Sequence, residues 1–167
     1  DVLAYTDAPW DGPTVVEPAD SPAVVVDDNA DMAVLRVRRS LMTGENAEAD
    51  FAEMPVLQLG TSSNLRPPKT LYALGFPVGM QFGITPTPTK GSLASKLEDV
   101  HGQWLKFDGL ISGGHSGGPV ITEDGKVVGW NVRNMGLKRG QSGLNHVRPI
   151  EAARPCVEAA GGRSEDL

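Results

Sequence analysis

The chain has 167 residues, of which 15 are Lys or Arg and 21 are Asp or Glu, so its net charge is −6 at pH 7. This length fits one domain, and the acidic balance argues against nucleic acid or an anionic membrane as the main partner. No apolar run reaches the ~18 residues that a membrane span requires. A single cysteine, Cys156, excludes an internal disulfide and a cysteine-rich zinc site.

Glycine and proline are abundant, with 20 and 13 residues, which predicts a β protein with many turns. Short β-branched runs bounded by turn residues predict the strands. In the first part of the chain they are Thr14–Val16, Ala23–Val26, Met32–Val37 and Pro55–Leu57. Between the last two, the polar segment Leu41–Glu53 predicts a loop excursion. Gly60–Thr70 has the composition of a linker.

The second part contains more predicted strands, and short antiparallel strands at this spacing indicate a closed barrel or a sandwich. They are Leu71–Phe76, Ile84–Thr85, Lys90–Ser95, Gln103–Phe107, Pro119–Ile121, Lys126–Trp130 and Leu144–Val147. Glu123-Asp124-Gly125 predicts a tight hairpin turn. A helix is predicted over Pro149–Ala160; Gly161-Gly162 ends it, and Pro155 makes it short or kinked.

The most informative segment is the run S-G-G-H-S-G-G-P-V, residues 112–120, in which four glycines flank Ser116. Glycine permits a positive φ and close backbone approach, so this loop can aim the amides of Gly114 and Ser116 at one point. Two such amides form an oxyanion hole, which stabilises the negative oxygen that forms when a hydroxyl attacks a carbonyl. Glycine-rich turns are also common in hairpins, so the run alone leaves both interpretations open.

Two further features accompany this loop. Asp31 precedes an apolar strand, where a carboxylate can orient an imidazole, although an ordinary turn aspartate is the simpler interpretation of that residue alone. A strand and turn, A-L-G-F-P-V-G, is followed by K-G-S-L-A-S.

Six motifs, taken together in chain order, resemble the trypsin-like serine proteases. They are D-M-A-V-L-R-V, A-L-G-F-P-V-G, K-G-S-L-A-S, S-G-G-H-S-G-G-P-V, G-K-V-V-G-W and G-L-N-H-V-R-P. The resemblance is closest to HtrA/Deg-type bacterial peptidases and runs from about Asp11 to about Pro155. It implies an all-β fold of two antiparallel barrels of the chymotrypsin type, with the active site between them. It also implies that Ser116 is the nucleophile, Asp31 the triad acid, and Gly114 and Ser116 the oxyanion amides. No metal or organic cofactor is expected.

The resemblance also assigns substrate contacts. The segment Trp130–Asn134 resembles the strand that pairs with the substrate backbone. Its residues Val132, Arg133 and Asn134 are the expected contacts. The walls of the side-chain pocket would be Leu110, Ile111, Ser112, Gly113 and the segment Leu144–His146, which includes His146. An apolar Leu110 at the pocket base favours small or apolar substrate side chains, whereas Arg133 and His146 would favour an acidic one.

The same resemblance divides the chain into four parts. Residues 1–60 would form a partial N-terminal barrel, 61–70 the linker, 71–148 the C-terminal barrel with the nucleophile loop, and 149–167 the terminal helix and tail. We count three or four strands in the first barrel, where the family has six.

The histidine of the triad poses the main difficulty, because the family places it before the acid and residues 1–30 contain none. His115 adjoins Ser116 in a tight loop, where neighbouring side chains diverge. His146 is expected at a pocket wall and His101 in a solvated turn. We therefore expect a fragment whose N-terminal strands and catalytic histidine were removed, are unresolved, or lie on a separate piece; in the last case that N-terminal segment would be a partner.

The expected protein is a serine endopeptidase that acts on polypeptides outside the cytoplasm, in the periplasm or secreted. The alternative is an inactive homologue that binds peptides by β-augmentation. A structural β domain with a chance G-x-S-G-G turn is the third interpretation.

Overall fold

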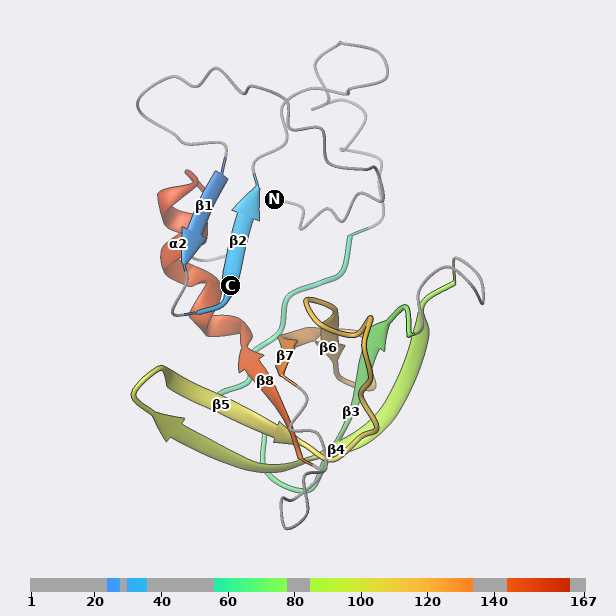
Figure 1. Cartoon of the computed structure of the whole chain (residues 1–167). Helices are drawn as coiled ribbons and strands as arrows, with labels where there is room; N and C mark the ends of the chain where they lie inside the picture. Colours follow the sequence, from blue (N-terminus) through green and yellow to red (C-terminus); the bar gives the residue numbers. More distant parts are fainter. Residues whose placement is uncertain (1–23, 28–29, 36–55, 78–84, 134–143, 163–167) are drawn as a thin grey trace. The chain divides into compact units, whose positions relative to one another are not determined.

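The computed structural model describes residues 24–27, 30–35, 56–77, 85–133 and 144–162 (Figure 1). The chain divides into two compact units. The barrel unit is Leu57–Ala153, and the hairpin unit combines Asp1–Val56 with Arg154–Asp166.

Six antiparallel strands close the barrel unit, in the order β3-β4-β5-β8-β7-β6. Their bounds are β3 Lys69–Gly75, β4 Thr87–Asp99, β5 Gly102–Phe107, β6 Pro119–Ile121, β7 Val127–Arg133 and β8 Asn145–Pro149. Closure leaves no free sheet edge. The predicted all-β class with a closed barrel of short antiparallel strands is confirmed.

The core of the barrel follows from the alternation of side chains along the strands. In β3, Leu71 and Ala73 are buried, and in β5 Leu105 and Phe107 are buried, because every second residue points inward. Phe107 is the largest of the fully buried side chains. The core cluster comprises Leu65, Leu71, Ala73, Leu93, Leu105, Phe107, Ile111, Val120, Val128 and Val147.

Some predicted strand bounds differ from the structure. β3 begins at Lys69, inside the segment with linker composition. β4 begins only at Thr87, so Thr85 lies outside it, and it continues to Asp99 because its polar end pairs with β5, Asp99 facing Gly102. Val56 and Leu57 are exposed and belong to no strand. Thr14–Val16 and Leu41–Glu53 lie outside the described residues.

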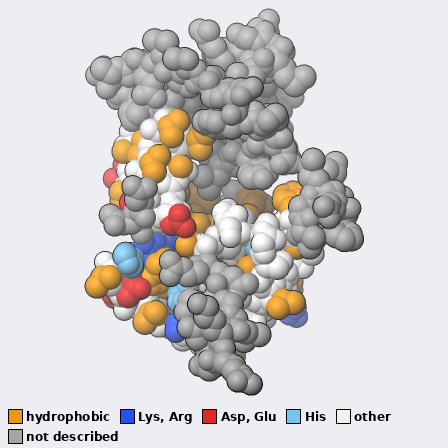
Figure 2. Space-filling view, viewed as in Figure 1, with side chains coloured by type: hydrophobic (Ala, Val, Ile, Leu, Met, Phe, Trp, Pro, Cys, Tyr) orange, Lys and Arg blue, Asp and Glu red, His pale blue; other side chains and the backbone are white. Residues whose placement is uncertain are grey.

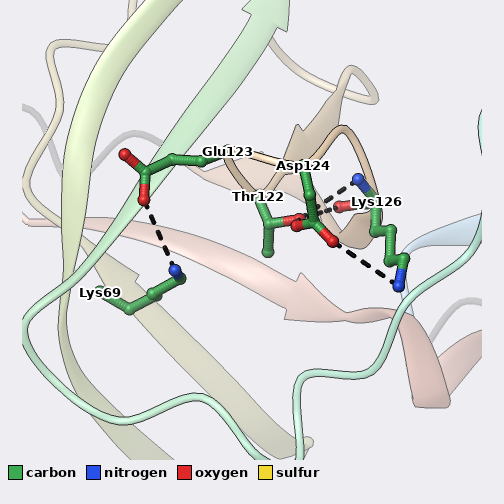
Figure 3. A network of polar contacts seen from close by, with 5 residues as sticks. All are labelled: Lys69, Thr122, Glu123, Asp124 and Lys126. Atoms are coloured by element: carbon green, nitrogen blue, oxygen red, sulfur yellow. Dashed lines mark hydrogen bonds and ion pairs between the residues drawn. The ribbon is translucent and has the colours of Figure 1, made fainter.

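The predicted turn between β6 and β7 is present, and Figure 3 shows its polar contacts. Gly125 has φ +80°, a conformation that is strained in a residue with a side chain. Thr122 N donates to Lys126 O at 2.9 Å. The Thr122 hydroxyl donates to Asp124 Oδ1 at 2.6 Å. This bond lowers the pKa of the Asp124 carboxyl. The turn therefore closes through its own side chains, as turn residues commonly do.

The Glu151 carboxylate joins the beginning of the barrel unit, at Thr61 and Ser62, to the end of that unit. Glu151 lies in the 3-10 helix η2 (Ile150–Ala153), directly after β8. It accepts hydrogen bonds from Thr61 Oγ1 at 2.7 Å, Ser62 N at 2.8 Å and Ser62 Oγ at 2.6 Å. Partial burial alone would raise the pKa of Glu151, but the bonds from Ser62 and Thr61 outweigh it and lower the pKa to about 2.

The hairpin unit is smaller. Its strands β1 (Val24–Asp27) and β2 (Met32–Leu35) pair antiparallel. The register puts four apolar residues on one face of the two-stranded sheet, and hydrophobic side chains gather over these strands in Figure 2. Exposed fractions on this face are 42% for Val24, 63% for Val26 and 40% for Leu35. Within the part of the chain that the structure describes, β1 and β2 form a two-stranded sheet, and this face of it is exposed.

The helix α2 (Arg154–Ala159) contacts both strands of the hairpin unit. The predicted helix Pro149–Ala160 is thus split into η2 and α2, and Pro155 lies in the first turn of α2, where its missing N–H costs little. Gly161 has φ +79° and donates to Glu158 O at 3.0 Å, and Gly162 donates to Val157 O at 2.8 Å. This pattern is a Schellman cap, so the two glycines end the helix as predicted. Neither helix segment in the described ranges has the length and apolar character needed to cross a membrane.

Candidate active site

The glycine-rich loop connects the segment after β5 to β6, and Ser116 is exposed at its surface. Two neighbouring strands hold this loop through backbone hydrogen bonds. On the β3 side, Phe76 N donates to Gly114 O at 2.9 Å. On the β7 side, Gly117 N donates to Asn131 O at 2.7 Å, and Asn131 N donates to Gly118 O at 2.9 Å. The serine is therefore presented by a fixed backbone frame.

Two of the glycines are required by this close packing. Gly114 has φ +98°, and a Cβ on it would lie 2.1 Å from Phe76 O. A Cβ on Gly118 would lie 2.1 Å from Leu74 O. Both distances are far below van der Waals contact. The oxygen atoms that each Cβ would meet belong to the backbone, so they cannot move away as the end of a flexible side chain could. The glycine pattern read from the sequence thus marks positions where the loop touches β3 and the residue that follows it.

The backbone amides of the loop differ in their hydrogen bonding. The amides of His115, Gly117 and Gly118 donate to backbone carbonyls, namely those of Ser112, Asn131 and His115. Within the described residues, the amides of Gly114 and Ser116 donate to no backbone acceptor. Unengaged N–H groups beside an exposed hydroxyl are what an oxyanion hole requires.

His115 does not face the same way as Ser116. Its side chain is 2% exposed, and its Nε2 lies 3.2 Å from Thr89 Oγ1 on β4. Its Nδ1 lies 3.2 Å from Ser112 O. The ring is therefore directed into the barrel unit and is held at both nitrogens, while Ser116 faces solvent.

The residues expected at the pocket wall have different environments. Leu110, expected at the pocket base, is 86% exposed, whereas Ile111 is 6% exposed and belongs to the barrel core. Ser112 and Gly113 are exposed in the loop. Asn145 Nδ2 donates to the carbonyl oxygens of Phe107 and Gly109, so this buried amide holds the segment before Leu110. A role for any of these residues in binding remains a prediction.

The structure brings together the segments expected to bind substrate on β7 and β8. Arg133 pairs with His146 in their antiparallel ladder, and Val132 is half-buried. The His146 ring contacts Trp104 edge-on, with 5.5 Å between ring centroids. Arg148 Cζ lies 4.1 Å from the centroid of the Trp104 ring, a cation–π contact. Asn134 and the Arg133 side chain lie outside the described part.

The other two polar candidates lie in turns. Asp31 belongs to the hairpin unit, in the turn between β1 and β2; it is exposed and has φ 51°, a left-handed conformation that aspartate tolerates better than most residues. Asp27 Oδ1 accepts a hydrogen bond from Ala30 N at 3.0 Å and closes that turn. His101 is exposed in the turn between β4 and β5, as the sequence suggested.

Sequence reasoning missed two residues that support the loop. Asn131, 2% exposed, donates from Nδ2 to Gly118 O at 3.2 Å, in addition to its two backbone bonds with the loop. An amide within the apolar run V-V-G-W-N-V was a usable signal, because a buried polar side chain needs a partner. Thr89, the partner of His115, carries no comparable signal. Within the described ranges, no three His, Cys, Asp or Glu side chains gather where they could hold a metal ion.

Comparison with known proteins adds to this geometry. Residues 8–129 match the family described as the trypsin-like peptidase domain. The chain is 32% identical over 148 residues to "Serine protease HTRA1" of Xenopus laevis, which covers 86% of this chain and 29% of that protein. It is 32% identical over 127 residues to "Probable periplasmic serine endoprotease DegP-like" of Hahella chejuensis, covering 76% of this chain and 24% of that protein.

Solved structures are similar in fold. The structure of "HtrA-type protease AlgW with decapeptide" superposes with a TM-score of 0.53 at 24% sequence identity, covering 65% of this chain and 35% of the other. The chain thus spans about a third or less of the length of these relatives.

Proposed function

The chain belongs to the trypsin-like peptidase domain family, and from this premise we propose that it is part of a serine endopeptidase. The observation that carries the proposal is the loop around Ser116. It combines an exposed hydroxyl, a backbone frame fixed by β3 and β7, and the adjoining amides of Gly114 and Ser116, which donate to no backbone acceptor among the described residues.

The reaction would be acyl transfer in two steps. Ser116 Oγ attacks the carbonyl carbon of a peptide bond, and its proton passes to a histidine base. The amides of Gly114 and Ser116 hold the oxygen that becomes negative. The C–N bond then breaks, the departing amine takes the proton from the histidine, and water releases the acyl group from Ser116 by the same route.

The base in this mechanism would be a histidine outside these 167 residues, held by Asp31. The three histidines of the sequence have other environments: His115 is held at both ring nitrogens inside the barrel unit, His101 lies in the turn after β4, and His146 contacts Trp104 edge-on. Hence Ser116 would need a partner from elsewhere in the full-length gene product.

The substrate would be a polypeptide that pairs with the end of β7, at Val132, Arg133 and Asn134. The side chain before the cleaved bond would lie near Leu110, Ile111, Ser112, Gly113 and His146. Because relatives carry names such as periplasmic endoprotease, we place the protein outside the cytoplasm. The four-part division at residues 60, 70 and 148 belongs to this proposal, with 1–60 as part of the first barrel.

The same placement of the histidines favours a second candidate function. A protein of this fold that lacks the base altogether would bind a peptide along β7 without cleaving it. A fluorophosphonate probe separates the two candidates, because it reacts only with an activated serine.

The test uses the full-length gene product, labelled with the fluorophosphonate and mapped by peptide mass spectrometry. We expect the label on Ser116, its loss in Ser116→Ala, and its retention in Ser63→Ala, which removes an exposed serine outside the loop and outside the proposed substrate contacts. Absence of label from the unaltered protein, or a label that survives Ser116→Ala, would contradict the endopeptidase. Peptide binding without labelling would support the binding module.

A further inference from the structure

Three separate contacts hold His115, the residue before Ser116. Its Cα lies close to β3, since a Cβ on Gly75 would come within 2.7 Å of it. Its backbone N–H donates to Ser112 O at 3.2 Å. Its ring, which is 2% exposed, reaches Thr89 Oγ1 from Nε2 at 3.2 Å and Ser112 O from Nδ1 at 3.2 Å.

Both neutral tautomers of the ring satisfy this arrangement. With the proton on Nδ1, the ring donates to Ser112 O, and the Thr89 hydroxyl donates to Nε2. With the proton on Nε2, the ring donates to Thr89 Oγ1, and Ser112 N, 3.4 Å away, can donate to Nδ1. The ring therefore connects β4 to the beginning of the loop whichever nitrogen carries the proton.

This connection bears directly on the two amides of the site. The N–H of Ser116 belongs to the peptide that follows His115 Cα, and the carbonyl of Gly114, in the peptide before it, is held by Phe76 N at 2.9 Å. A ring fixed at both nitrogens fixes the Cα between these peptides. A shift of the ring would rotate the Ser116 amide, which the proposed function pairs with the Gly114 amide in holding the oxyanion.

We infer that His115 is a positioning residue. Through its bonds to Thr89 and Ser112 it sets the direction of the Ser116 amide and of the serine itself. The inference rests on the proposed function of Ser116 as the nucleophile. His115 touches no substrate in this scheme and acts only through the backbone.

Three substitutions of His115 separate its two hydrogen bonds. The amide of Asn reaches about as far as Nδ1 and can keep the bond to Ser112, whereas the amide of Gln reaches about as far as Nε2 and can keep the bond to Thr89. Alanine keeps neither. In the full-length gene product we expect His115→Ala to lower kcat and the rate of fluorophosphonate modification about tenfold or more, with KM little changed. His115→Asn and His115→Gln should each recover part of that rate.

A more distant substitution tests whether the effect passes through the ring. Thr89→Val removes the hydroxyl at nearly constant volume and lies on β4, outside the loop that carries Ser116. We expect it to lower the modification rate several-fold and to shift the backbone amide NMR resonances of Gly114 and Ser116. In the His115→Asn background, where the bond to Thr89 is absent, it should have little further effect. The matched control is Thr87→Val, at an exposed position of the same strand.

The outcomes are distinct from those of the proposed function. If the unaltered protein takes no label on Ser116, the endopeptidase proposal fails, and the amide resonances still test the role of His115. If Thr89→Val leaves those resonances unchanged, as Thr87→Val should, the inference is overturned. It is also overturned if the His115 variants lower thermal stability but leave the modification rate of the folded protein unchanged.

Discussion

The barrel unit and the hairpin unit are both built on antiparallel strands but shield their apolar side chains to different extents. In the barrel unit, closure of six strands places Phe107 and Leu71 at 0% exposure. In the hairpin unit, two strands present Val24, Val26 and Leu35 on one exposed face. The difference shows that an apolar strand face is buried by the strands that close around it, and not by its own composition.

A matched pair of side-chain truncations tests this difference between the two units. Phe107→Ala should lower the free energy of unfolding by about 3–5 kcal/mol, because it removes a fully buried ring and leaves a cavity. Val26→Ala, at a residue 63% exposed, should cost at most about 0.5 kcal/mol. Urea unfolding followed by Trp fluorescence measures both changes. Comparable losses would mean that the exposed face of β1 and β2 is covered in solution.

A second prediction concerns the glycine-rich loop around Ser116. Gly114→Ala should lower the rate of fluorophosphonate modification of Ser116 by about 100-fold, the typical loss when one oxyanion donor is displaced. The added Cβ would meet Phe76 O at 2.1 Å and would strain a φ of +98°. Gly125→Ala provides the control, because its φ is +80° and a Cβ there meets no atom within 4 Å. Equal loss of modification in both variants would contradict a specific role of Gly114.

The smallest expected effect is a dependence of barrel stability on pH. Because the folded pKa of Glu151 is about 2, below its ordinary value of 4.5, the charged form is favoured by folding. The stability that it contributes is therefore complete above about pH 4.5 and is lost as the pH falls towards 2. Glu151→Gln should remove about 1–2 kcal/mol at pH 7 and flatten this pH dependence. Unfolding curves at pH 7 and pH 3 test this prediction. It is contradicted if the free energy of unfolding of the variant changes between these pH values as much as that of the unaltered protein.

The sequence allowed much of the barrel unit to be predicted, and the reasons are local. Pro119–Ile121 was predicted with its observed bounds because glycines precede it and the Glu123–Gly125 turn follows it. The helix end was predictable from Gly161-Gly162. β4 is longer than predicted because strand pairing with β5 extends it through Lys96–Asp99, where side-chain composition gives no alternating pattern.

The candidate site was predictable where backbone geometry demands glycine and was hidden where side chains meet across strands. Gly114 and Gly118 could be identified because no other residue fits their positions. The contact of His115 with Thr89 could not, since a pair 26 residues apart forms only once β4 lies against the loop. The proposed role of Asp31 and those of the residues expected to contact the substrate stay predictions, because they depend on parts of the site that sequence patterns alone do not place.

The bonds from Glu151 to Thr61 and Ser62 join residues about 90 positions apart in sequence. The polypeptide therefore enters the barrel unit and leaves it at neighbouring positions, which the Glu151 carboxylate holds together. Such a unit is suited to circular permutation, in which its two ends near Glu151 are joined and new termini are made elsewhere. Val100, which is 94% exposed between β4 and β5, is a suitable position for the new termini. The barrel could then be transplanted between proteins as a self-contained part.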